Sequence, residues 1–136
     1  MTEIEVCCDK ILKQIRAIFE YNKDENIFII DKIYGYDKYR LILKVYEEQN
    51  WLLCFALWPE EIKITNRIKV IEFINEANIE IKIGNFVYNT NNCLVKFKNS
   101  IDIEGVKLNK KILANLMMCC ISMIEEYEEQ LISLNR

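Results

Sequence analysis

The sequence predicts an α+β fold in which an antiparallel sheet packs against helices, in the order α-β-β-β-α-β-β-α. Helical patterns stand at both ends of the chain, and a third divides the strand patterns into two groups. Short polar turns separate consecutive strands, which favours antiparallel pairing. The chain has 136 residues, 51% of them hydrophobic. A single domain over residues 1–136 is therefore expected.

The first helix is predicted for residues 2 to about 20. Thr2 and Glu5 have the spacing of a capping box, in which each side chain bonds the other residue's backbone N–H. Apolar residues then recur at the helical period. They are Ile4, Cys8, Ile11, Leu12, Ile15, Ile18 and Phe19. A polar run at 22–26 ends the pattern.

Three strands are predicted next, from runs of β-branched and aromatic residues. The first is the apolar stretch at 27–30. The second and third, at 39–46 and 51–58, flank the polar sequence EEQN and so predict a hairpin. Pro59 ends the third strand because it has no N–H to donate to a neighbouring strand.

A middle helix is predicted for residues 65–77. Its expected buried residues are Ile68, Ile71 and Ile74. Asn75 and Asn78 close this helix, and Gly84 interrupts the strand that follows. These three residues have two interpretations. Either they form the helix-to-strand junction, through left-handed caps at the asparagines and a bulge or close packing at Gly84, or they bind a ligand.

Two strands near 80–89 and 93–103, joined by the turn TNN, and a closing helix at 109–133 complete the chain. The residues expected on the buried side of that helix are Ile112, Leu116, Cys119, Met123, Tyr127 and Leu131. Its acidic stretch EEYEE at 125–129 is either a solvated face or a surface for a basic partner.

The composition argues against several classes of function. The chain has no histidine, which excludes Ser-His and Cys-His nucleophile pairs and His-ligated metals. Three glycines are too few for a phosphate-binding loop. A net charge of −3 gives no basic face for nucleic acid. We expect no catalytic residues, no metal, no cofactor and no nucleic-acid partner.

The six cysteines and the N-terminus bear on location. No C-x-x-C pair occurs, so the cysteines are interpreted as reduced core residues, with a redox role as the alternative. No stretch reaches the roughly 20 apolar residues that a membrane span requires, and the first ten residues lack the pattern of a secretory signal. A cytoplasmic protein without membrane attachment is expected.

The 39–58 hairpin is the most informative feature for function. If its turn contains an even number of residues, Val45 opposes Leu52 and Leu43 opposes Cys54 on the core side. An apolar patch then forms on the other side. Its residues are Ile42, Tyr46, Trp51, Leu53, Phe55 and Leu57.

This patch requires cover. The cover is either a dimer partner or bound peptide, or else the chain's own helix or a register shifted by one residue. The first interpretation predicts a protein-binding homodimer. The alternative function is a small-molecule sensor, or an enzyme of unrecognised type, with a pocket between sheet and helix. Polar residues available for such a pocket are Tyr34, Arg40, Asn75 and Asn78.

Several short motifs together resemble those of a known family. They are Ile74-Asn75, Asn78, Gly84 with Phe86, Leu94-Val95-Lys96-Phe97, Ser100-Ile101, LWPEE at 57–61, and a long last helix with Tyr127. On these motifs and their order the chain resembles the YbjN family of bacterial proteins, described as "putative sensory transduction regulators". The resemblance covers nearly the whole chain.

The resemblance implies the fold of type III secretion chaperones. It also implies a non-enzymatic interaction module, often dimeric, that holds an extended segment of another protein. It provides no catalytic residues. The expected function is therefore that of a dimeric regulator or chaperone-like adaptor for a partner protein that the sequence does not identify.

Overall fold

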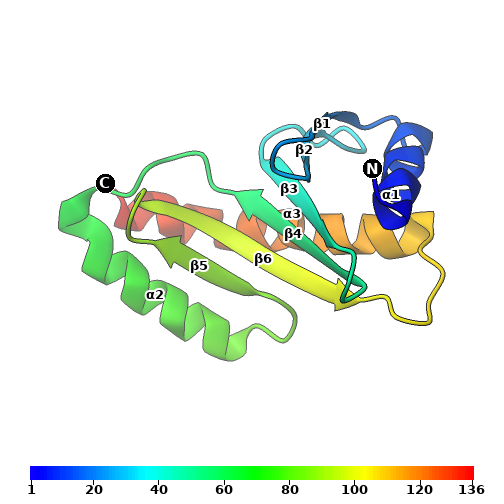
Figure 1. Cartoon of the computed structure of the whole chain (residues 1–136). Coiled ribbons are helices and arrows are strands. Elements are labelled where there is room, and N and C mark those ends of the chain that lie inside the picture. The colour runs from blue at the N-terminus through cyan, green and yellow to red at the C-terminus, as the bar shows by residue number, and fades with distance from the viewer.

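The computed structural model describes residues 1–136 and contains three α-helices and six strands (Figure 1). The helices are α1 (Glu3–Gln14), α2 (Arg67–Glu80), which follows a short 3-10 turn at Ile64–Asn66, and α3 (Lys110–Leu134). The strands are β1 (Ile18–Asn22), β2 (Ile27–Lys32), β3 (Arg40–Tyr46), β4 (Trp51–Leu57), β5 (Asn85–Asn89) and β6 (Leu94–Asp102). The α+β class is confirmed, with the predicted helices and strands in the predicted order and β1 in addition.

All six strands form one antiparallel sheet in the order β1-β2-β3-β4-β6-β5. In Figure 1, α3 passes behind β4 and β6, α1 lies near the start of α3, and α2 runs beside β5. Most strand residues on the helix side are buried; they include Phe28, Leu43, Cys54 and Phe97, each 0% exposed. The hydrophobic core therefore lies between the sheet and the helices.

The predicted first helix is too long. Helix α1 ends at Gln14. The chain then turns through Arg16, whose φ of 57° lies in the left-handed region that commonly ends helices. Residues 18–22 instead form β1, which pairs with β2. The reason is that Phe19 also fits the two-residue period of a strand, in which it lies opposite Ile30 beside the core.

The predicted buried side of the middle helix is wrong in part. Ile74 is buried, but Ile68 and Ile71 are 71% and 41% exposed, and Val70 and Ala77 are buried instead. Because α2 covers only the margin of the sheet, it buries a narrow stripe. The helix also continues to Glu80, so the strand expected from 80 begins at Asn85.

The buried side of α3 is broader than predicted and displaced by one residue. Leu116 and Leu131 are buried as expected, whereas the other predicted residues are only partly buried. The fully buried side also contains Leu113, Met117, Cys120, Ile121 and Ile124. A helix that lies across the middle of a sheet buries more residues per turn than the single stripe that the prediction assumed.

The predicted capping box at the first helix is present. The Thr2 hydroxyl accepts from Glu5 N at 3.3 Å, and Glu5 Oε1 accepts from Thr2 N at 3.1 Å. The Tyr21 hydroxyl donates to the other Glu5 oxygen, which fastens α1 to β1. Burial raises the pKa of Glu5, but the bonds from Tyr21 and Thr2 outweigh burial and leave that pKa below its ordinary value.

Candidate functional site

The register of the β3–β4 hairpin decides which side chains face away from the helices. Residues 47–50 form a four-residue turn, so Val45 lies opposite Leu52 and Leu43 opposite Cys54, as the even-turn register predicts. All four of these side chains face the core. The alternate residues of both strands therefore point to the other side of the sheet.

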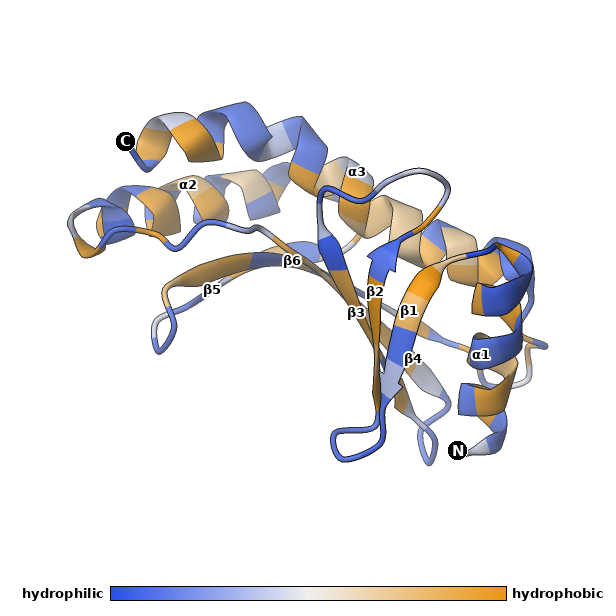
Figure 2. Cartoon of the chain, turned by 90° about the horizontal axis from the view of Figure 1, so that it is seen from above, coloured by the Kyte–Doolittle hydropathy of each residue, from blue (hydrophilic) through white to orange (hydrophobic).

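That other side, here called the open face, has no helix over it. Its apolar residues are Ile27, Ile29, Ile42, Tyr46, Trp51, Leu53, Phe55, Leu57, Val87 and Leu94. In Figure 1 α3 lies behind the sheet, and Figure 2 shows that the sheet curves with the helices on its outer side, so that the open face is concave. Trp51 is 48% exposed and the others are partly exposed. All six predicted patch residues lie on this face.

Three lysines also lie on the open face, among the apolar side chains. Lys44 is opposite Leu53, Lys96 is opposite Leu57, and Lys98 is opposite Phe55. The Lys96 ammonium is 4.0 Å from the centroid of the Phe55 ring. The sequence prediction missed these lysines, although their alternation with core residues in β3 and β6 was available as a signal.

The lysines have no acidic partner, since the ion pairs of the chain involve only Lys13, Lys38 and Arg40. Burial lowers the pKa of Lys96, and the like charge of Lys98 lowers it further. Positive charge is therefore held on this face without compensation from the chain itself.

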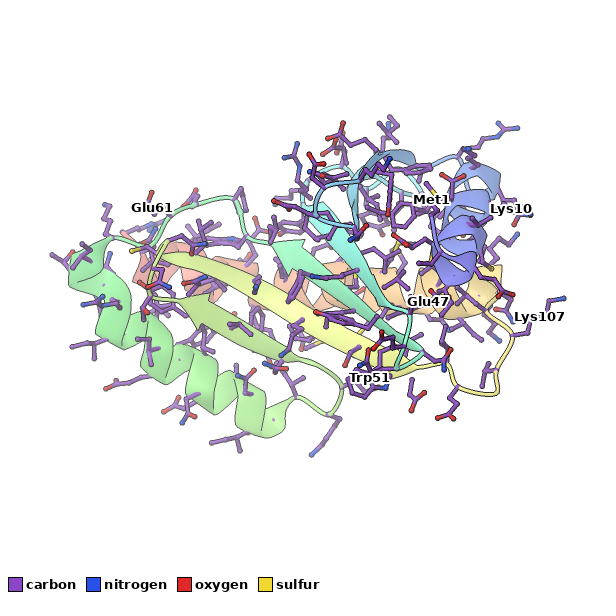
Figure 3. The ribbon with its side chains drawn as sticks, in the orientation of Figure 1. Met1, Lys10, Glu47, Trp51, Glu61 and Lys107 are labelled. Atoms are coloured by element: carbon purple, nitrogen blue, oxygen red, sulfur yellow. The ribbon has the colours of Figure 1, made fainter.

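A partly open hollow of about 510 Å³ lies at one end of the open face. It is lined mainly by Tyr46, Trp51, Leu53, Ser100 and Asp102. Figure 3 shows Trp51 at the tip of the β3–β4 hairpin, close to the turn that contains Glu47. The hollow is large enough to accept a bulky apolar side chain from another molecule.

Asn78 fastens α2 to the outer strand of the sheet. Its side-chain Nδ2 donates to Phe86 O at 3.0 Å, and its Oδ1 accepts from Phe86 N at 2.7 Å. One amide thus satisfies both backbone groups of a residue on an edge strand, as a neighbouring strand would. Asn75 points to solvent and is exposed. These contacts support the junction interpretation for Asn78. The predicted left-handed caps are wrong, because Asn75 and Asn78 both lie within α2, which continues to Glu80.

Gly84 occupies a crowded position in the same junction. Its φ is +75°, and a Cβ there would come within 2.6 Å of Lys98 O and 2.7 Å of the Phe97 ring. Only glycine combines this backbone conformation with such a close approach. Gly84 therefore lets the chain pass tightly against β6, without a bulge in the pairing of β5 with β6.

The polar residues considered for a ligand pocket are not brought together. Arg40 lies on the open face, where its Nε is 2.8 Å from Asp31. Asn78 meets β5, which is separated from β3 by β4 and β6, a distance of about 14 Å at the usual strand spacing. Tyr34 is in an exposed loop. These residues do not line a common cavity.

The acidic stretch at 125–129 is partly engaged with the chain itself. The Glu128 carboxylate accepts from the Tyr39 hydroxyl and pairs with Lys38. The bonds from Lys38 and Tyr39 hold the pKa of Glu128 below its ordinary value. Glu125, Glu126 and Glu129 are exposed.

The six cysteines are all unpaired, with Cys8, Cys54 and Cys120 buried. Burial raises the pKa of the Cys8 thiol to about 12, which disfavours the reactive thiolate.

No group of three or more cysteine, aspartate or glutamate side chains is placed to hold a metal ion. None of the helices is both long and apolar enough to cross a bilayer.

Comparisons with known proteins bear on the family. The model of the YbjN family, described as "Putative bacterial sensory transduction regulator", matches residues 11–133. No curated protein matches the chain. Among solved structures, the fold is similar to that of YbjN from E. coli, titled a "putative transcription regulator", with a TM-score of 0.62 and 10% identity over 96% of this chain and 87% of that one. Because the family match spans most of its length, this chain belongs to the YbjN family.

Proposed function

We propose that this chain is a non-enzymatic, cytoplasmic regulator that acts by binding protein on the open face of its sheet. The observation that carries the proposal is the curved, helix-free face of β2 to β6, with Leu53 and Phe55 at its centre. An apolar surface of this kind, rimmed by polar groups, is typical of a protein-binding site. The regulatory part of the proposal is supported by the description of the family.

Two kinds of protein could occupy the face: a second copy of the chain, which would make a homodimer, or a segment of another protein. Both would bury Leu53 and Phe55. The variant Leu53→Glu/Phe55→Glu therefore tests both, because it places two charges where either occupant would exclude water. Neither residue is fully buried in the chain itself, so the variant is expected to fold.

The experiment has two measurements on the full chain. Light scattering reports whether wild type is a dimer that the variant converts to monomer. Selection from a display library of random peptides, with counter-selection against the variant, reports whether the face binds segments. A wild-type monomer that also yields no peptide dependent on Leu53 and Phe55 would overturn the proposal.

The alternative is a small-molecule sensor or an enzyme of unrecognised type. The hollow beside Trp51 is the feature that favours a small ligand. A thermal-shift screen of metabolites separates the two functions, since a ligand at 100 times its Kd stabilises a protein by about 2.7 kcal/mol. A metabolite that stabilises wild type but not the Trp51→Ser variant would support the alternative.

A further inference from the structure

The charge of the open face differs from that of the chain as a whole. The net charge of the chain is −3, yet this face contains Lys44, Lys96 and Lys98 with no carboxylate within 4.0 Å of their ammonium groups. The three lysines lie on β3 and β6, on either side of β4, among apolar side chains. An occupant of this face therefore meets positive charge.

The carboxylates on the same face do not compensate for these lysines. Asp31 is already paired with Arg40. Glu20 lies on the edge strand β1, and Asp102 is the last residue of β6. The acidic groups are therefore paired or at the margins, and the three lysines lie on β3 and β6, on either side of β4.

Two of the three lysines already lie over aromatic rings of the chain. Lys96 lies over the Phe55 ring at 4.0 Å, and Lys44 lies over the Tyr46 ring at 5.3 Å. Such cation–π contacts order a long side chain. Binding of a carboxylate to these lysines would therefore cost less lysine side-chain entropy than binding to freely moving lysines.

Apolar and basic groups alternate across the strands of the face. Lys44 lies between Ile27 and Leu53, and Lys98 lies beside Phe55. A ligand that covers this area must therefore present apolar and acidic side chains together. The hollow beside Trp51 would accept one of its large apolar side chains.

A second copy of the chain and a nucleic acid fit the face less well. Across a two-fold contact each copy would present the same three unpaired lysines, which would have only the few marginal carboxylates of the other copy to meet. A single-stranded nucleic acid needs a series of exposed aromatic rings for base stacking; here Trp51 is exposed at one end, but the rings of Tyr46 and Phe55 are covered by Lys44 and Lys96.

We propose that the occupant of the open face is an acidic, apolar segment of a partner protein, whose carboxylates bind Lys44, Lys96 and Lys98. This inference rests on the proposed function and adds the chemistry of the partner.

The test uses the full chain and the peptides recovered by the display selection. Each peptide is synthesised as selected and again with every Asp and Glu changed to Asn and Gln. Affinity is measured from the fluorescence of Trp51, since the other tryptophan, Trp58, is only 2% exposed. We expect acidic peptides to be enriched, and their amide versions to bind about tenfold more weakly, a loss of about 1.4 kcal/mol.

Two charge-matched variants locate the effect. Lys44→Gln/Lys96→Gln/Lys98→Gln is expected to bind the acidic and amide versions equally. The control Lys10→Gln/Lys69→Gln/Lys107→Gln removes the same charge from exposed positions elsewhere and should keep the tenfold preference.

The outcomes separate this inference from the proposed function. If no peptide depends on Leu53 and Phe55 and the chain is a monomer, the proposed function fails. If such peptides exist but the amide versions bind equally, or if both lysine variants lose the preference alike, only the inference fails. A dimer dissolved by Leu53→Glu/Phe55→Glu, or tighter binding of labelled oligothymidylate, would also overturn the inference.

Discussion

The two faces of the sheet differ in burial and in the partners of their charged groups, although the same strands form both. Leu52 and Leu53 are neighbours in β4, yet Leu52 is 0% exposed beneath the helices and Leu53 lies on the open face. On the helix side, the carboxylates of Glu5 and Glu128 find donors in Tyr21, Tyr39 and Lys38. On the open face, three lysines find no acceptor. The carboxylates of the helix side are thus bonded within the chain, whereas the lysines of the open face have no acidic partner in it.

This contrast separates folding from binding. Burial of the helix-side residues supplies most of the hydrophobic stabilisation, at roughly 25 cal/mol for each Å² removed from water. The open-face residues supply less because they remain partly in water. Substitutions on the two faces should therefore separate into effects on stability and effects on binding.

The largest expected effect comes from the matched pair Leu52→Ala and Leu53→Ala. Leu52→Ala leaves a cavity in the core and should cost about 2–5 kcal/mol of unfolding free energy, whereas Leu53→Ala should cost less than about 1 kcal/mol. Urea unfolding monitored by circular dichroism measures both. Equal losses would mean that Leu53 is as well packed as the core, and the contrast between the faces would be wrong.

The next largest effect is expected at Gly84, in the junction between α2 and β5. Gly84→Ala forces a Cβ to within 2.6 Å of Lys98 O and so should cost at least about 2 kcal/mol. Gly105→Ala is the control, because its φ of +71° is similar but nothing lies within 4 Å of the new Cβ. It should cost only the left-handed penalty of about 1 kcal/mol. Thermal unfolding of both variants gives the comparison; similar losses would argue against the close approach.

A similar comparison applies to the two asparagines of the junction. Asn78→Ala removes both bonds to the Phe86 backbone and should cost about 1–3 kcal/mol. Asn75→Ala, at an exposed position, should change stability by less than about 0.5 kcal/mol. Hydrogen exchange of β5 amides should rise only in the Asn78 variant. Wild-type stability of Asn78→Ala would favour a ligand role for this residue.

The ion pairs on the helix side predict a dependence on pH. Because the folded-state pKa of Glu128 is below its ordinary value of 4.5, its ionised form stabilises the fold above that value, and the stabilisation is lost as pH falls through the folded pKa. Wild type should therefore exceed Glu128→Gln in stability at neutral pH, and the difference should shrink as pH falls below about 4.5. Glu126→Gln, at an exposed neighbouring position, is the control.

The smallest expected effect has the opposite sign. Burial and Lys98 lower the folded-state pKa of Lys96, so its charged form is disfavoured by folding at neutral pH. Lys96→Gln should therefore leave the melting temperature unchanged or slightly higher, although it weakens binding of acidic peptides. A clear fall in melting temperature would show that Lys96 serves the fold.

The β3–β4 hairpin could be predicted because its turn and the alternation of its buried residues can be read from a short stretch of sequence. The turn EEQN and the alternation around Leu43 and Cys54 were enough to place Trp51, Leu53 and Phe55 on one face. The strand β1 could not be predicted with the same rules, since Phe19 fits both helical and strand periods and only its pairing with Ile30 decides.

The outward position of Ile68 and Ile71 was also beyond local rules. Apolar residues recur at helical spacing on more than one side of α2. The pattern therefore does not say which side of the helix meets the sheet. The contact between Asn78 and Phe86 decides it, by fixing the helix against β5. The lysines of the open face were visible in the sequence but acquire meaning only when β3, β4 and β6 lie side by side.

We expect partners to bind the open face and no other surface. An amide NMR titration of the full chain with an acidic peptide from the selection locates the binding surface. The largest shift changes are expected in β3, β4 and β6, around Lys44, Leu53 and Lys98. Largest changes in α2, around the exposed Ile68, Ile71 and Ile79, would contradict it.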